Sequence, residues 1–154
     1  MEKRFMEMAI ELAKDSVDRG GGPFGAVVVK DGTVIAARAN SVTLDNDPTA
    51  HAEVAAIREA CAKLNTFSLE GCEIYASCEP CPMCLGAIYW SGIRCVYYAA
   101  TRKEAADVGF DDSLIYDQIV LAPEDRSVPG FKLECESQQQ PFDKWCAKKD
   151  KTEY

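Results

Sequence analysis

Two short motifs hold residues of the types that bind zinc and carry protons. The segment His51-Ala52-Glu53 offers an imidazole and a carboxylate, and Pro80-Cys81-Pro82-Met83-Cys84 offers two thiols. On the first turn of a helix, Cys81 and Cys84 would share a face, and the positive end of the helix dipole favours their thiolate forms. Two thiolates and one imidazole suit tetrahedral zinc, and three protein ligands leave the fourth position open to water, as in catalytic sites. We therefore predict one Zn²⁺ per chain, bound by His51, Cys81 and Cys84.

Glu53 is the candidate proton carrier of the same site. Zinc lowers the pKa of a bound water to about 7, so hydroxide is available at neutral pH. Residues two positions apart face different sides in the middle of a helix, but at its first turn His51 and Glu53 can approach one site. A carboxylate there can take the water proton as a general base and pass it on as a general acid. The predicted chemistry is a zinc-assisted hydrolysis with Glu53 as a catalytic residue.

Three other interpretations of these residues give a role to fewer of them. A redox pair of Cys81 and Cys84 leaves His51-Ala52-Glu53 without a role, and a structural zinc knot with Cys78 as fourth ligand leaves Glu53 idle. A non-enzymatic zinc module that holds a partner is the third. We expect the remaining cysteines to be small buried hydrophobes: Cys61, Cys72, Cys95, Cys135 and Cys146.

The elements that must position these motifs alternate along the chain. Hydrophobic periodicity predicts helices over 2–19, 48–64 (capped by Asp47), 81–89 and 142–149, with short helical pieces over 102–107 and 113–118. Strands are predicted over 26–29, 33–38, 72–77, 94–100 and 131–135, and an Asp31-Gly32 hairpin turn joins the first two. This order favours an α/β fold, a three-layer α/β/α sandwich with a mixed five-stranded sheet and parallel crossovers. Both motifs then lie at the sheet end where such folds bind ligands.

Composition excludes several classes of protein. A chain of 154 residues is expected to form a single domain, here 1–154, and its apolar fraction of 47% is wrong for a disordered protein. No stretch is long enough to span a bilayer and no signal peptide is visible, so we expect a cytoplasmic protein with reduced thiols and no membrane partner. The formal net charge of −8 argues against a nucleic-acid partner, because phosphate binding depends on Lys and Arg.

The two motifs resemble the H-x-E and P-C-x-x-C signature of the zinc-dependent cytidine deaminase-like superfamily. Within it, the chain is similar to the bacterial guanine deaminases over residues 21–27, 46–53, 77–90, 105–113 and 151–154. The resemblance implies hydrolysis of a free purine base, guanine to xanthine and ammonia. Related activities stay open as alternatives: a tRNA adenosine deaminase, which would need a basic groove, or a deaminase of guanosine or cytosine.

The resemblance also implies roles outside the two motifs. Asp112 would accept a hydrogen bond from the substrate amino group or assist its departure, as a second catalytic residue. The implied substrate contacts are Phe24, Asn40, Ala52, Trp90 and Tyr154. Bacterial members resemble homodimers in which the C-terminal segment, here 138–154, covers the partner's site. The simpler interpretations are core aromatics for Phe24 and Trp90, a turn residue for Asn40, a helix N-cap for Asp112 and a frayed chain end for Tyr154.

Overall fold

The computed structural model describes residues 2–153, which fall into two compact units, Met1–Asp112 and Ser113–Tyr154. The first unit contains α1 (Lys3–Asp18), β1 (Gly25–Lys30), β2 (Thr33–Ala39), α2 (Val42–Asp45), α3 (Ala52–Leu64), β3 (Cys72–Cys78), α4 (Pro82–Trp90), β4 (Cys95–Ala100) and α5 (Arg102–Asp107). The second contains α6 (Ser113–Ile119), a 3₁₀ turn (Pro123–Asp125) and α7 (Gln140–Ala147). Among residues 2–153, no helix combines the length and apolar character needed to cross a membrane.

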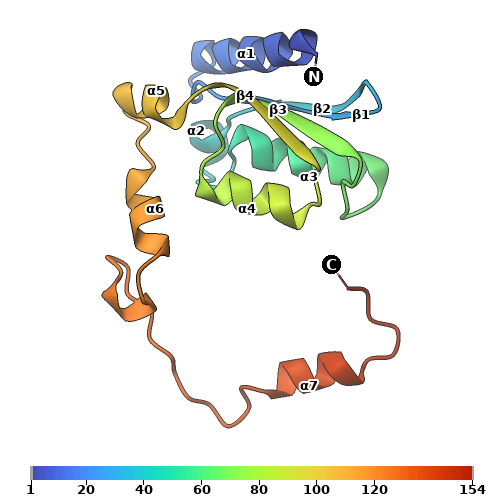
Figure 1. Cartoon of the computed structure of the whole chain (residues 1–154), viewed down its shortest axis with the longest axis vertical. Helices are drawn as coiled ribbons and strands as arrows, with labels where there is room; N and C mark the ends of the chain where they lie inside the picture. Colours follow the sequence, from blue (N-terminus) through green and yellow to red (C-terminus); the bar gives the residue numbers. More distant parts are fainter. Residues whose placement is uncertain (1, 154) are drawn as a thin grey trace. The chain divides into compact units, whose positions relative to one another are not determined.

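The first unit is built on a mixed four-stranded sheet of order β2-β1-β3-β4 (Figure 1). Strand β1 pairs antiparallel with β2 and with β3, and β3 pairs parallel with β4. The predicted hairpin is confirmed: Asp31 and Gly32 adopt φ values of 48° and 73°, as a tight turn between twisted strands requires. One parallel pair, spanned by the α4 crossover, is present in the described sheet.

Helices cover both faces of this sheet, as predicted. Helix α1 lies on one face, and α3 and α4 lie on the other (Figure 1). Because successive strand residues point to opposite faces, β1 divides its valines between two cores. Val27 and Val29 pack with Phe5 of α1, whereas Val28 packs with Ala56 and Ile88 of α3 and α4.

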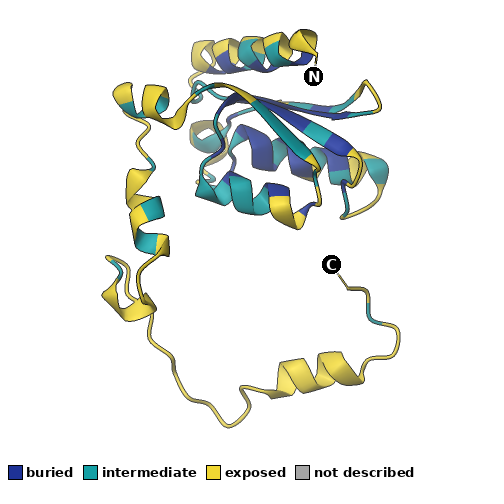
Figure 2. Cartoon of the chain, viewed as in Figure 1, coloured by how far each residue is buried: buried dark blue, intermediate teal, exposed yellow. Residues whose placement is uncertain are grey.

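The predicted fifth strand over 131–135 is wrong. These residues have no regular structure, and all five are exposed. Alternation of apolar and polar residues predicts a strand, but a strand also needs a neighbouring strand with which to form hydrogen bonds. The described part of the second unit contains no strand. No residue of 113–153 is buried, as Figure 2 shows by colour. Cys135 and Cys146 are therefore exposed thiols, contrary to the expectation of burial.

The segment before α3 also differs from its prediction. The helix begins at Ala52 rather than at Pro48. Asp47 closes a local turn instead of capping a helix: its Oδ1 accepts hydrogen bonds from the backbone N and the Oγ1 of Thr49, at 2.8 and 2.7 Å. The consequence is that His51, not Asp47, stands at the start of α3.

Candidate active site

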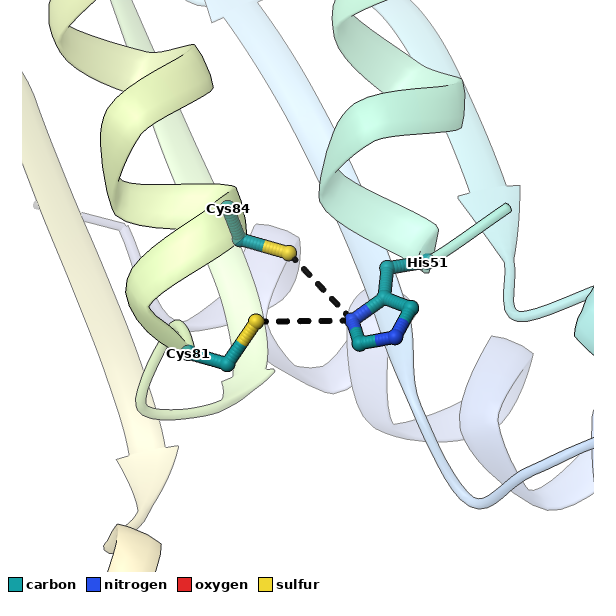
Figure 3. Close-up of side chains that lie close together, drawn as sticks. All are labelled: His51, Cys81 and Cys84. Carbon is teal, nitrogen blue, oxygen red and sulfur yellow. Dashed lines mark hydrogen bonds between the residues drawn. The ribbon is translucent and has the colours of Figure 1, made fainter. Parts of the chain in front are cut away.

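The ligand candidates lie at the starts of two helices. His51 is the N-cap of α3, with an extended backbone (φ −65°, ψ 151°). Cys81 is the N-cap of α4 (φ −66°, ψ 168°), followed by Pro82, whose fixed φ suits the first helical position. Cys84 follows on the first turn of α4. Figure 3 shows the two helix starts side by side, with the three side chains between them.

Three potential ligand atoms converge there. Nδ1 of His51 lies 3.6 Å from Sγ of Cys81 and 3.5 Å from Sγ of Cys84 (Figure 3). All three atoms lie within 4.8 Å of one another. Tetrahedral zinc bonds sulfur at about 2.3 Å and imidazole nitrogen at about 2.0 Å, which places neighbouring sulfur and nitrogen ligands about 3.5 Å apart. The donor set and its spacing therefore fit a zinc ion.

The charge state of Cys81 also favours metal binding. Hydrogen bonds from Cys84 and His51 lower the pKa of the Cys81 thiol to about 4. The pKa of Cys84 is raised, because its thiol donates to Cys81 and is buried. The site therefore contains a thiolate at neutral pH, and the thiolate is the form that binds zinc.

Glu53 reaches the same site from the first turn of α3. It is 7% exposed, and burial raises the pKa of its carboxyl. The carboxylate is within hydrogen-bonding contact of Cys84 and in the electrostatic field of Cys81. A buried carboxyl with a raised pKa, beside a metal site, is suited to exchange protons near neutral pH.

Cys78 does not join the ligand cluster. It ends β3, and its thiol donates to the backbone O of Thr101 at 3.6 Å. Burial, followed by the charge of Glu53, raises the pKa of Cys78 to about 11, so the thiol stays protonated. The geometry thus favours three protein ligands over a four-ligand zinc knot.

An aromatic pair lies next to the predicted base contact Asn40. Phe24 packs edge-to-face against Phe110, with ring centroids 4.9 Å apart and planes at 88°. The backbone N of Asn40 donates to the O of Phe24 at 2.9 Å. Phe110 is not among the residues predicted from the sequence, and the signal that could indicate it is an aromatic side chain directly before two aspartates.

Two further predicted residues lie close to the ligands. Ala52, the first residue of α3, is fully buried between His51 and Glu53. Asp112 is half-buried, and its pKa is raised by burial and then by the nearby Cys81 thiolate. The chain therefore brings a second carboxylate into the electrostatic field of the ligand cluster.

The structure does not bring Trp90 to this cluster within one chain. Trp90 is the last residue of α4 and is 74% exposed, whereas Cys81 and Cys84 lie at the first turn. At 1.5 Å per residue, the helix separates its two ends by about 12 Å. Tyr154, predicted to close the pocket, lies outside the described residues.

A cavity of about 400 Å³ lies on the α1 side of the sheet, between α1, β4 and α5. Its walls are mostly apolar and include Phe24 and Cys78, but none of the three ligand candidates. Glu53 is likewise absent from its lining.

The chain matches known proteins in both sequence and fold. Residues 1–100 match the model of the cytidine and deoxycytidylate deaminase zinc-binding region. The chain is 51% identical over 151 residues to the guanine deaminase of Bacillus subtilis, covering 97% of each chain. The crystal structure of that enzyme superposes with a TM-score of 0.97 at 50% identity, covering 100% of this chain and 99% of the other.

Two further relatives match a smaller part of the chain. A tRNA-specific adenosine deaminase of Aquifex aeolicus is 46% identical over 104 residues, 68% of this chain and 69% of the relative. A protein solved in complex with 2,6-diaminopurine superposes with a TM-score of 0.68 at 39% identity, covering 70% of this chain and 61% of its own.

Proposed function

Because this chain belongs to the cytidine and deoxycytidylate deaminase zinc-binding family, we propose that it hydrolyses guanine to xanthine and ammonia. The observation that carries the proposal is the extent of similarity. The likeness to a guanine deaminase covers 97% of both chains, whereas that to a tRNA-specific adenosine deaminase covers 68% of this one. The acidic net charge of −8 likewise favours a small neutral base over a polyanion.

His51, Cys81 and Cys84 are the residues that would hold zinc in this enzyme. A zinc ion held there would supply hydroxide near neutral pH, because zinc lowers the pKa of water to about 7. Glu53 takes the proton that the water gives up and passes it to the ring nitrogen beside the amino-bearing carbon. It then takes the remaining proton of the hydroxyl group added to the carbon and gives it to the amine, so that the C–N bond breaks, ammonia departs and the oxygen stays on the carbon as a carbonyl. Burial of Glu53 supports this role, because it raises the carboxyl pKa toward the working pH.

The proposal extends to the substrate contacts. Asn40 hydrogen-bonds the base, Phe24 forms a wall against its ring, and Ala52 lines the pocket between His51 and Glu53. Asp112 accepts a hydrogen bond from the substrate amino group and assists its departure. Burial, followed by the charge of Cys81, raises the pKa of the Asp112 carboxyl, which supports a place for Asp112 near the ligand cluster. Trp90 is omitted, because it lies at the other end of α4.

We also propose that two chains form a dimer in which residues 138–154 of each chain, including Tyr154, cover the partner's site. The support for this proposal is the exposed apolar surface of the second unit. None of residues 113–153 is buried, yet this segment carries large apolar side chains such as Leu133 (82% exposed) and Phe142 (65%). Apolar surface of this extent is characteristic of a chain that is completed by a partner.

A panel of aminated bases tests the proposed function. Purified protein is incubated with guanine, guanosine, adenine, cytosine and a tRNA anticodon stem, and ammonia release is measured. We expect guanine to be the preferred substrate. Ammonia release from another base instead of guanine would contradict the proposed substrate but support the proposed deamination. Salt-sensitive activity on the stem would favour a tRNA deaminase. Zinc-bearing protein without any release would favour a non-enzymatic zinc module.

A further inference from the structure

Ser16 is a fully buried polar residue on the apolar face of α1. It continues the stripe formed by Phe5, Ala9 and Ala13, and its exposed fraction is 0%. Its Oγ donates a 2.9 Å hydrogen bond to the backbone O of Asn40, which lies 24 positions further along the chain. The reaction proposed above assigns nothing to Ser16, so its burial and its partner need another explanation.

The hydrogen bond from Ser16 supplies a donor to the backbone carbonyl of Asn40, which lies just beyond the paired residues of β2. Ala39 is the last residue of β2 that pairs with β1, opposite Gly25, and Asn40 follows it. Asn40 is buried, and a buried carbonyl without a donor is costly. On its other side, the backbone N of Asn40 donates to Phe24 O at 2.9 Å. The backbone of Asn40 is therefore held at both its carbonyl and its amide.

The side chain of Asn40 is fixed in one orientation. Its Oδ1 accepts hydrogen bonds from the backbone N of Gly22 at 3.3 Å and of Val42 at 3.2 Å. Because two N–H groups face this atom, it must be the carbonyl oxygen of the amide, and Nδ2 is left to donate. Asn40 is thus set to meet an acceptor atom, such as a ring nitrogen or a carbonyl oxygen of a purine.

The glycine run of the neighbouring loop permits this arrangement. A Cβ on Gly21 would lie 2.4 Å from Ser16 Oγ and 2.8 Å from Asn40 O, so no larger residue fits without breaking the contact. A Cβ on Gly22 would lie 3.1 Å from Asn40 Oδ1. The loop and Ser16 together enclose Asn40 from the side of α1.

We propose that Ser16 is a positioning residue, which holds Asn40 so that Nδ2 is presented to the purine base. This inference rests on the proposed function, because it requires Asn40 to bind the base. It adds to that function a residue on the opposite layer of the fold that determines how well the base is held.

A double-mutant cycle tests the proposal. The variants Ser16→Ala, Asn40→Ala and the double variant are compared by kcat, KM and thermal midpoint, with guanine as substrate. We expect Ser16→Ala to raise KM about three- to tenfold, the range given by one net hydrogen bond. In the Asn40→Ala background the same change should alter KM less than twofold, because Ser16 then has no side chain to position.

A matched control separates positioning from general stability. Ser91, the C-cap of α4, is also buried, and its hydroxyl donates to Ile88 O at 2.9 Å rather than to Asn40. Ser91→Ala should leave KM unchanged even where it lowers the thermal midpoint. If Ser16→Ala does not fold, Ser16→Cys keeps a weaker donor and serves in the same cycle.

The outcomes distinguish this proposal from the proposed function. An equal rise in KM in both backgrounds, or a lowered thermal midpoint with KM unchanged, would overturn the role of Ser16 while guanine deamination stands. If wild-type protein deaminates another base, the substrate is wrong and the cycle is run on that base. If it deaminates none, the proposed function and the role of Ser16 both fail.

Discussion

Nδ1 of His51 lies 3.5 Å from Sγ of Cys84, although the two residues are 33 positions apart in the chain. The contact joins the starts of α3 and α4, so the ligand set depends on where each helix begins. His51 is also the one histidine of the sequence. If it binds zinc, it cannot carry protons, and that work passes to the carboxylates nearby.

His51→Ala is expected to lower zinc content and deamination together. The change removes the one nitrogen ligand and leaves the two cysteine sulfurs, which do not complete a tetrahedral site. Elemental analysis of the purified variant, beside an activity assay, measures both effects. Cys78→Ala serves as the control and should retain about one zinc per chain, because its thiol bonds to Thr101 O rather than to the cluster. Full zinc occupancy in His51→Ala would contradict the proposed ligand set.

Glu53→Gln is expected to keep zinc and fold but to lower kcat by about 10²- to 10⁴-fold, the usual contribution of a positioned acid–base group. The amide has nearly the same size, so packing in the buried site is preserved, but it cannot exchange the proton. Steady-state kinetics, zinc analysis and the thermal midpoint are measured on the same preparation. Activity near the wild-type level would exclude Glu53 as the proton carrier.

Local sequence signals predicted the parts of the site that depend on helix starts. Pro82 and the Cys-x-x-Cys spacing located the first turn of α4 to within one residue. The predicted start of α3 at Pro48 is too early, because Asp47-Pro48 has the residue types of a helix cap but forms a turn closed by Thr49. The error did not separate His51 from Glu53, since both still fall at the first turn of the helix.

Features that depend on distant partners could not be predicted in this way. Residues 131–135 have the alternation of a strand, yet no strand pairs with them in the described chain. In the sequence, nothing distinguishes Ser16 from other small residues on a helix face. Its hydrogen bond to Asn40 joins segments 24 positions apart. The run Gly20-Gly21-Gly22 is typical of a close backbone approach, and Gly21 makes one to Ser16 and Asn40.

Asp112→Asn is expected to lower kcat for guanine about ten- to a hundredfold. The loss corresponds to a hydrogen bond with a charged group, because the amide cannot accept from the substrate amino group with the strength of a carboxylate. Asp107→Asn is the matched control: Asp107 is exposed and pairs with Lys103 at 3.2 Å. Kinetics on both variants measure the difference. Equal kcat values for Asp112→Asn and Asp107→Asn would show that Asp112 has no catalytic role.

Thr101→Ala is expected to lower the free energy of unfolding by about 0.5–2 kcal/mol, the usual effect of losing a helix N-cap. Thr101 and Glu104 form a capping box at α5, in which Thr101 N donates to Glu104 Oε2 at 2.7 Å and Glu104 N donates to Thr101 Oγ1 at 3.3 Å. Urea unfolding measures the change, and Thr101→Ser should recover most of it. Lys103→Ala, on the same helix, removes only an exposed ion pair and should cost less than about 0.5 kcal/mol. Equal losses in the two alanine variants would contradict the role of the cap.

Mixing two inactive chains tests whether residues 138–154 act on a partner. A chain that ends at residue 137 keeps Glu53 and the zinc ligands but lacks the covering segment, whereas full-length Glu53→Ala keeps the segment but not the proton carrier. If the segment covers the partner's site, refolding the two together should restore guanine deamination, because the intact site of one chain is then closed by the other. Each chain refolded alone is the control, and light scattering should give twice the 16.9 kDa chain mass for full-length protein. A mixture as inactive as its components, from chains that each fold, would show that the segment serves its own chain.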